Sequence, residues 1–131
     1  MMADDAPYHA HVYFTGADRT AASTLRDRFA ALMAPGSNPA IIFVGSMVEG
    51  PVGPHPLPQY EIHFLAPARD GVIALIEQAG LRALIHPLTD DDLADHTALG
   101  HWIGPPLVLD QSVLDPPGFN QGVARFGKSD F

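Results

Sequence analysis

The chain has 131 residues, 47% of them hydrophobic, and carries 15 Asp and Glu against 7 Lys and Arg, for a formal net charge of −8. An acidic balance of this size does not fit binding to nucleic acid or to an anionic membrane surface. The absence of cysteine excludes disulfides, thiolate catalysis and iron–sulfur clusters. The length predicts a single domain over residues 1–131. Within it we expect a core at about 8–110 and a C-terminal arm at 111–131.

The N-terminal stretch "MMADDAPYHA" lacks the basic and apolar segments of a secretory signal. No apolar run approaches the roughly 20 residues that a membrane-spanning helix needs. We therefore expect a cytoplasmic protein that does not insert into a membrane.

The first half of the chain predicts a strand, a helix and a second strand. Tyr8–Phe14 is short, aromatic and β-branched, and the turn "TGAD" follows it. Asp18 is a suitable N-cap for a helix that reaches about Met33, because apolar residues recur there at intervals of three to four. The apolar run Ala40–Met47 predicts a second strand that is buried on both faces.

The second half predicts a strand, a helix and a strand. Gln59–Leu65 alternates as a strand does, and residues 81–86 alternate in the same way. Pro67 and Gly80 are suitable residues to open and to end the helix between them.

The order β-α-β-β-α-β is that of the ferredoxin-like fold, in the α+β class. We expect a four-stranded antiparallel sheet in the spatial order fourth, first, third and second strand, with both helices on one face. Thr89 is expected to cap a short helix through "DDDLADHTALGHW". From Ile103 onward, the Pro- and Gly-rich sequence predicts an irregular arm over the surface or over a neighbouring subunit.

Histidine is as frequent as Lys and Arg together, and imidazole is the commonest metal ligand in proteins. The seven histidines are His9, His11, His55, His63, His86, His96 and His101. Alternation along the strands places His9 and His11 on the helix-free face, together with Glu61 and His63. The predicted strand order brings His9 near His63 and His86, with His11 and Glu61 one step further along.

Such a group of imidazoles with one carboxylate fits a divalent first-row metal, and two His plus a carboxylate suit non-haem Fe(II). Each residue also has a plainer interpretation. An H-x-H pair occurs on solvated strands, Glu61 alone fits an exposed carboxylate, and His63 fits a dimer face. His86 precedes Pro87 at a strand end and is expected at the rim of the sheet.

His55 stands between Pro54 and Pro56, which restrict the backbone on both sides. This stiffness suits a positioned acid or base, and it equally suits a simple turn. His55 is expected near the opposite end of the third strand from His9, so a loop folding back or a dimer would have to bring them together. His96 shares a helix side with Asp92, either as a site residue or as an exposed helix pair.

Several segments taken together resemble the DOPA 4,5-dioxygenase family. They are "YHAHVYF", "GPHPLPQYEIHF", "IHPLTDDDLADHTALGHWIG" and Leu109–Asp110, in order over most of the chain. The resemblance implies a ferredoxin-like domain, usually dimeric, that opens a catechol such as DOPA by extradiol cleavage with Fe(II) and O2.

Position by position, the resemblance implies His9, His11 and His86 as metal ligands, with Glu61 in reserve. It implies His55 as the acid–base residue, with His96 second. Non-haem Fe(II) is the expected metal, and another divalent ion such as Zn is the alternative.

This chain departs from the family pattern at two positions. Leu99 stands where a second His often follows the "DH" histidine, and His63 stands where a small residue is expected. His101, next to Trp102, has no counterpart in that pattern. These departures bear on the substrate more than on the fold.

A second hypothesis is a dimeric small-molecule binding or sensing domain without dioxygenase activity. A third is a non-oxidative metal enzyme such as a cyclase or hydrolase. The ferredoxin-like fold hosts many unrelated functions, so the fold alone does not separate them.

Overall fold

The computed structural model describes residues 6–115 and 125–128. In chain order the elements are β1 Pro7–Tyr13, α1 Arg19–Ala31, β2 Phe43–Val44, β3 Gln59–Leu65, the 3-10 turn η1 Ala66–Ala68, α2 Arg69–Ala79, β4 Arg82–Pro87, α3 Asp92–His96, β5 His101–Ile103 and the 3-10 turn η2 Gln111–Val113. Among the described residues, no helix has the length and apolar character needed to cross a membrane.

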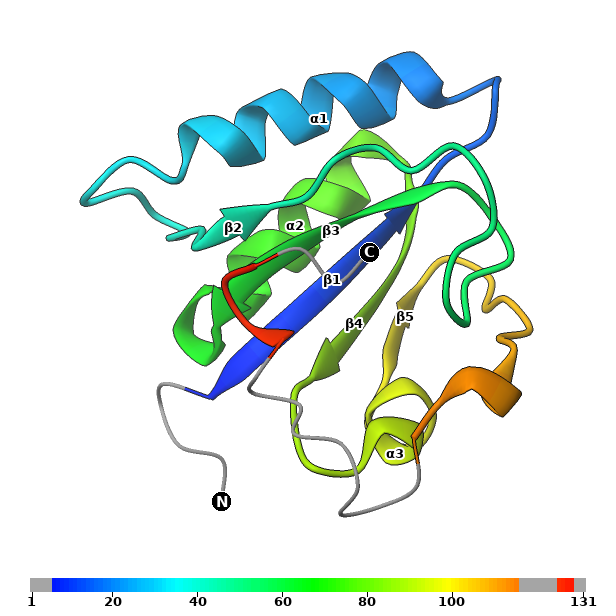
Figure 1. Cartoon of the computed structure of the whole chain (residues 1–131). Coiled ribbons are helices and arrows are strands. Elements are labelled where there is room, and N and C mark those ends of the chain that lie inside the picture. The colour runs from blue at the N-terminus through cyan, green and yellow to red at the C-terminus, as the bar shows by residue number, and fades with distance from the viewer. Residues whose placement is uncertain (1–5, 116–124, 129–131) are drawn as a thin grey trace.

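The sheet has the order β2-β3-β1-β4-β5, and its neighbouring strands are antiparallel. The first four strands confirm the predicted ferredoxin-like arrangement, and β5 adds a fifth strand at the free edge of β4. Figure 1 shows the sheet from the face that the helices leave open, with α2 behind it and the segment Arg125–Lys128, in red, in front of β1.

The main core lies between the sheet and the two long helices. α1 contributes Ala22, Leu25 and Phe29, which recur at the three-to-four spacing of one helix face. The strand residues that meet them have the parity predicted from the sequence: Ala10, Val12, Phe14, Tyr60, Ile62 and Phe64. Gly80 ends α2 in the left-handed conformation, with φ 71°, as its position predicted.

Register places the polar residues of the open face opposite one another. His9 pairs with His63 on β3 and with His86 on β4, while His11 pairs with Glu61. These side chains are almost fully buried, because loops and the segment Arg125–Lys128 cover the open face. The sheet therefore has two buried faces, one apolar and one rich in imidazole.

The prediction of a fully buried second strand at Ala40–Met47 is wrong. Only Phe43–Val44 is regular strand, both residues are half-buried, and Ile42 is 43% exposed. The segment still follows β3 through hydrogen bonds from the backbone N–H groups of Ile42 and Gly45. An edge strand has only one neighbouring strand, so part of it stays exposed to solvent. The apolar sequence therefore predicted more burial than this position allows.

The prediction that Thr89 caps the last helix is wrong. The cap is Asp91, whose carboxylate accepts from the Ala94 N–H at 2.9 Å. The helix ends at His96, and "HWI" instead pairs with β4, whose outer edge would otherwise lack backbone partners. Of the predicted C-terminal arm at 111–131, residues 111–115 and 125–128 are described, and the rest lies outside the described residues.

Ile62 and Ile42 offer a matched test of this architecture. Ile62→Ala removes a fully buried side chain from the core and is expected to lower the free energy of unfolding by about 2–5 kcal/mol. Ile42→Ala acts at a half-exposed edge and is expected to cost no more than about 1 kcal/mol. Urea denaturation of the metal-free protein measures both, and equal losses would contradict the assigned faces.

Candidate metal centre

Six of the seven histidines lie together in the interior of the open face. We call them the histidine cluster: His9, His11, His55, His63, His86 and His96, none more than 6% exposed. His101 is exposed and lies outside it. Buried imidazole nitrogens are normally hydrogen-bonded or bound to a metal. The partners of these six rings therefore indicate what the cluster does.

The cluster is one continuous row of rings drawn from five parts of the chain. β1 supplies His9 and His11, and β3, β4, α3 and the loop before β3 supply one each. Ring centroids lie 3.7 Å apart for His9 and His63, 4.1 Å for His11 and His55, and 4.2 Å for His86 and His96. His11 and His86 stack at 5.0 Å and so join the second and third pairs, and the His9 ring lies 5.4 Å from that of His86.

Backbone carbonyls fix which nitrogen carries the proton in two of these rings. The Nδ1–H of His86 donates to the Pro87 carbonyl at 2.8 Å, and that of His96 donates to the Asp92 carbonyl at 2.8 Å. A carbonyl only accepts, so each Nδ1 must be protonated, and in the neutral ring Nε2 then holds a lone pair. Metal-ligating histidines are typically oriented in this way by the partner of their other nitrogen.

His11 has the same arrangement with a side-chain partner. Its Nδ1 lies 3.0 Å from the Gln59 amide oxygen, which accepts its proton, and its Nε2 lies 2.9 Å from Nε2 of His86. If the Gln59 amide were turned over, the Nε2–H of His11 would donate to Nε2 of His86. With the amide oxygen as the acceptor, as it is placed here, two lone pairs face each other at hydrogen-bond distance. A cation that both nitrogens can bind removes this repulsion, so the residues present fit a divalent metal.

Three groups of potential ligand atoms lie within 4.8 Å of one another, and the part of the chain that the structure describes supplies all of them. They are His9, His11 and His86; His11, His55 and His96; and His9, Glu61 and His63. Neither ring nitrogen of His9 makes a hydrogen bond of normal geometry with a described residue, although the Arg125 backbone lies near enough to favour its protonation slightly. Such a buried imidazole is suited to a ligand role.

The loop before β3 folds back over the sheet and carries His55 into the cluster. Val52 and His55 exchange backbone hydrogen bonds, and the Pro54 carbonyl accepts from Asp110 N–H at 2.9 Å. The side chain is held by Tyr13, whose hydroxyl lies 2.7 Å from its Nδ1. Of the two routes considered from the sequence, the chain uses the returning loop.

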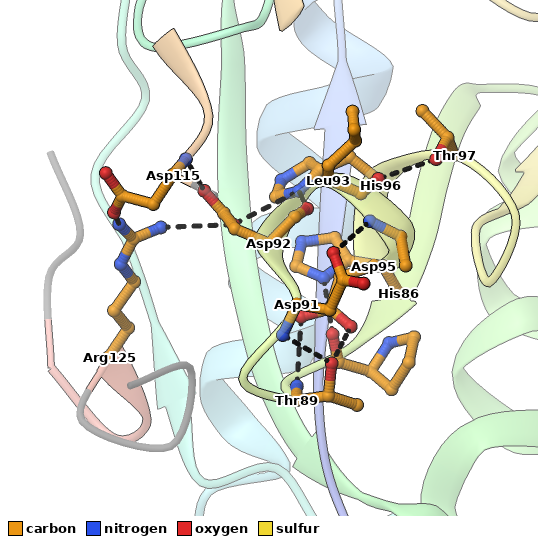
Figure 2. A network of polar contacts seen from close by, with 12 residues as sticks. His86, Thr89, Asp91, Asp92, Leu93, Asp95, His96, Thr97, Asp115 and Arg125 are labelled. Carbon is orange, nitrogen blue, oxygen red and sulfur yellow. Dashed lines mark hydrogen bonds and ion pairs between the residues drawn. The ribbon is translucent and has the colours of Figure 1, made fainter. Parts of the chain in front are cut away.

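The connection between β4 and α3 is a small polar network that sets His96 beside His86 (Figure 2). The Asp95 carboxylate accepts from both the N–H and the hydroxyl of Thr89, at 2.9 and 2.6 Å. Asp92 lies 3.4 Å from His96 Nδ1 and also meets Arg125, whose guanidinium lies 3.4 Å from it. The acidic run after His86 thus acts mainly by fixing a tight turn.

Burial keeps four rings of the cluster neutral. Loss of solvent lowers the pKa of His9, His11 and His86 well below 6.5, and the neighbouring imidazoles lower it further. Burial also lowers the pKa of His55 to about 3, with a smaller contribution from His96. It raises the pKa of Tyr13, so that its hydroxyl stays protonated.

All five predicted site residues come together: His9, His11, His55, His86 and His96. The reserve residue Glu61 is buried beside them. The prediction that His86 lies at the rim of the sheet is wrong. Pro87 continues β4 beyond it, and the His86 ring lies on the open face. Leu99 and His101 are exposed and lie outside the cluster.

Two residues of the site were given no role from the sequence. Tyr13 holds His55, and Gln59 holds His11. Both lie on the open face by the same strand parity that placed His9, His11 and Glu61 there. That parity was therefore the signal that could have identified them.

The fold and the cluster together define an α+β protein with a buried multi-histidine site. The profile of the Dopa 4,5-dioxygenase family matches residues 8–113, so the chain belongs to this family and the resemblance found in the sequence is confirmed.

Individual relatives agree with this assignment. The chain is 35% identical over 113 residues to a DOPA 4,5-dioxygenase from Amanita muscaria, a match that covers 82% of this chain and 49% of that protein. It is 34% identical over 76 residues to an uncharacterized 21.2 kDa protein from Botryotinia fuckeliana, covering 50% of this chain and 42% of the relative. The chain thus spans about half or less of the length of these curated relatives.

A solved structure shares the fold. It is a protein from Nostoc punctiforme provisionally described as a dioxygenase, with a TM-score of 0.72 and 32% sequence identity. The match covers 84% of this chain and 91% of the other. At this identity the likeness extends beyond a shared architecture to sequence kinship.

The lowered pKa values predict how stability of the metal-free protein depends on pH. Below pH 6.5 the unfolded chain binds protons at its histidines, while the buried rings in the folded state stay neutral. The free energy of unfolding should therefore fall as pH decreases below about 6.5, by up to about 1.4 kcal/mol per pH unit for each such histidine. Above about pH 7 these groups should contribute no further change.

Urea denaturation between about pH 5 and pH 8 measures this slope. His55→Gln should reduce it by the contribution of one proton, whereas His101→Gln, at an exposed position, should leave it unchanged. A stability that stays flat through this range would show that the rings are not held neutral.

Proposed function

We propose that this protein is a metal-dependent extradiol dioxygenase that opens the ring of a catechol such as DOPA or a related phenolic. The observation that carries the proposal is the convergence of His11 Nε2 and His86 Nε2 at 2.9 Å, with both Nδ1 atoms engaged by acceptors. Family membership supports an oxygenase, and the donor set supports the metal.

His9, His11 and His86 would hold the metal, and Glu61 is placed to add an oxygen ligand. Neutral imidazoles suit non-haem Fe(II), with Zn as the alternative divalent ion. When bound, such a metal supplies a Lewis-acidic centre that favours loss of the catechol protons and allows reaction with O2. The lowered pKa values of the three rings keep their lone pairs available for it at neutral pH.

His55 is the proposed acid–base residue. Its Nδ1 contacts Tyr13 Oη, and a hydroxyl can either donate or accept. When Nε2 of His55 carries the proton, Tyr13 donates to Nδ1; when Nδ1 carries it, Tyr13 accepts. Because burial lowers its pKa to about 3, the ring is neutral near pH 7 and would act first as a base. With Nδ1–H donating to Tyr13, it can accept a proton from the substrate at Nε2 and later return it while Nδ1 stays hydrogen-bonded.

His96 is the second acid–base candidate, and it lines a cavity through which a substrate could reach the cluster. A cavity of about 150 Å³ is lined by Gly53, Pro54, Asp92, His96, Val113, Leu114 and Arg125. A planar catechol that enters it would meet His96, whose ring centroid lies 6.1 Å from that of His55. We propose this side as the substrate entrance.

The central experiment loads the protein anaerobically with Fe(II), then adds L-DOPA or caffeic acid and O2. The wild type should consume O2 and form a yellow ring-opened product. His11→Ala and His86→Ala should each lose metal by at least about tenfold in affinity, because each removes a ligand. The matched control His101→Ala changes an exposed histidine and should retain both metal and activity.

Metal content after dialysis and far-UV circular dichroism accompany the rates. Full metal occupancy in either ligand variant would refute the ligand assignment. A wild-type protein that binds catechol but takes up no O2 with iron bound would favour a binding or sensing domain instead.

His55→Ala separates proton transfer from metal binding. We expect it to retain metal and to lose about 10²–10⁴-fold in kcat, the usual contribution of general acid–base catalysis. Loss of metal would show that His11, His55 and His96 form the ligand set. An unchanged kcat would remove His55 from the mechanism.

A further inference from the structure

His63 is the cluster residue without a role so far, and it is one of the two departures from the family pattern. It is fully buried, with its ring stacked on His9 at 3.7 Å and close to the rings of Phe43 and Phe126, at 4.8 and 5.8 Å. Phe126 belongs to the segment Arg125–Lys128, which crosses the open face in Figure 1.

The hydrogen bonds of His63 define its tautomer. The backbone N–H of Gly127 donates to His63 Nδ1 at 2.9 Å, so this nitrogen must hold a lone pair. In the neutral ring the proton is then on Nε2, which lies 3.4 Å from Glu61 Oε1. The protonated side of the His63 ring therefore faces the carboxylate at ion-pair distance, without a hydrogen bond of normal geometry. In His86 and His96, by contrast, it is Nδ1 that carries the proton.

Glu61 is enclosed on its other side as well. A Cβ placed on Gly45 would lie 2.8 Å from Glu61 Cγ, so the stem of Glu61 occupies the space that any other residue at position 45 would need. The carboxylate is 3% exposed, and its ligand atom lies within 4.8 Å of that of His9. A buried carboxylate is stabilised by a polar partner or a cation, and here the ring of His63 lies at ion-pair distance and the metal-ligand group of His9 lies close by.

We propose that His63 is a positioning residue, which holds Glu61 toward His9 as the oxygen ligand of the metal centre while Gly127 of the C-terminal segment fixes its tautomer. The inference rests on the proposed function, because it assigns a task within the same metal site. In this role His63 meets Glu61 and not the metal, because Gly127 on Nδ1 leaves the proton of the neutral ring on Nε2, 3.4 Å from the carboxylate. Direct binding of the metal by His9, Glu61 and His63 is the alternative that the donor set allows. Through Gly127, the C-terminal segment becomes part of the support of the metal centre.

Three substitutions at His63 distinguish the role of Nδ1, which faces Gly127, from the role of Nε2, which faces Glu61. In His63→Gln the amide nitrogen replaces Nε2 and can still donate to Glu61. In His63→Asn the shorter amide replaces Nδ1 and can meet Gly127 but does not reach Glu61. His63→Leu retains bulk and makes neither bond.

The readout is the affinity for Co(II), measured by competition with a chelator, together with the visible spectrum of the Co(II) protein. We expect the Gln variant to bind within about threefold of wild type. The Asn and Leu variants should bind about 10–100-fold more weakly, as is usual when the partner of a ligand is lost. Their Co(II) spectra should shift, because an oxygen ligand is displaced.

Gly45→Ala tests the same carboxylate from the opposite side, without touching a histidine. It should push Glu61 from its place and give the Co(II) spectrum of the Asn variant. If Asn, Leu and wild type bind Co(II) equally and with one spectrum, the positioning role is refuted while the metal centre stands. A wild-type protein that binds no Co(II) overturns the proposed function and this inference with it.

Discussion

The contact between His11 and His86 is the constraint on which the rest of the site depends. Both rings are buried, the far nitrogen of each lies against an oxygen acceptor, and both present Nε2 to the same point in space. Pairing of β1 with β4 holds the two backbones in place, so the rings have little freedom to turn away. Folding has thereby assembled an arrangement that is costly without a cation between the rings and favourable with one.

Much of the surrounding structure serves to keep this arrangement. The Pro87 and Asp92 carbonyls, the Gln59 amide and the Tyr13 hydroxyl each engage the far nitrogen of a different ring. These partners come from strands, a loop and a short helix, and no local segment contains them all. The apolar face beneath the helices supplies the stability that this polar face does not.

Sequence patterns predicted the sheet face of the site, because side chains alternate strictly along a strand. His9, His11, Glu61 and His63 lie where that alternation put them. The same patterns misjudged β2, since an apolar run does not reveal that its strand is at an edge. The sequence left open whether a returning loop or a dimer brings His55 to the site, and it gave no sign that Gly127 docks on His63. Both depend on contacts between segments far apart in the chain.

The neutrality of the buried rings has a consequence for the energetics of loading. Histidine sites near a protein surface are partly protonated around neutral pH, so a metal must first displace protons and its affinity rises with pH. Here desolvation has already removed that competition from His9, His11 and His86. Metal uptake by these rings near neutral pH would release almost no protons to the buffer, so the heat of association would not depend on the ionisation enthalpy of that buffer.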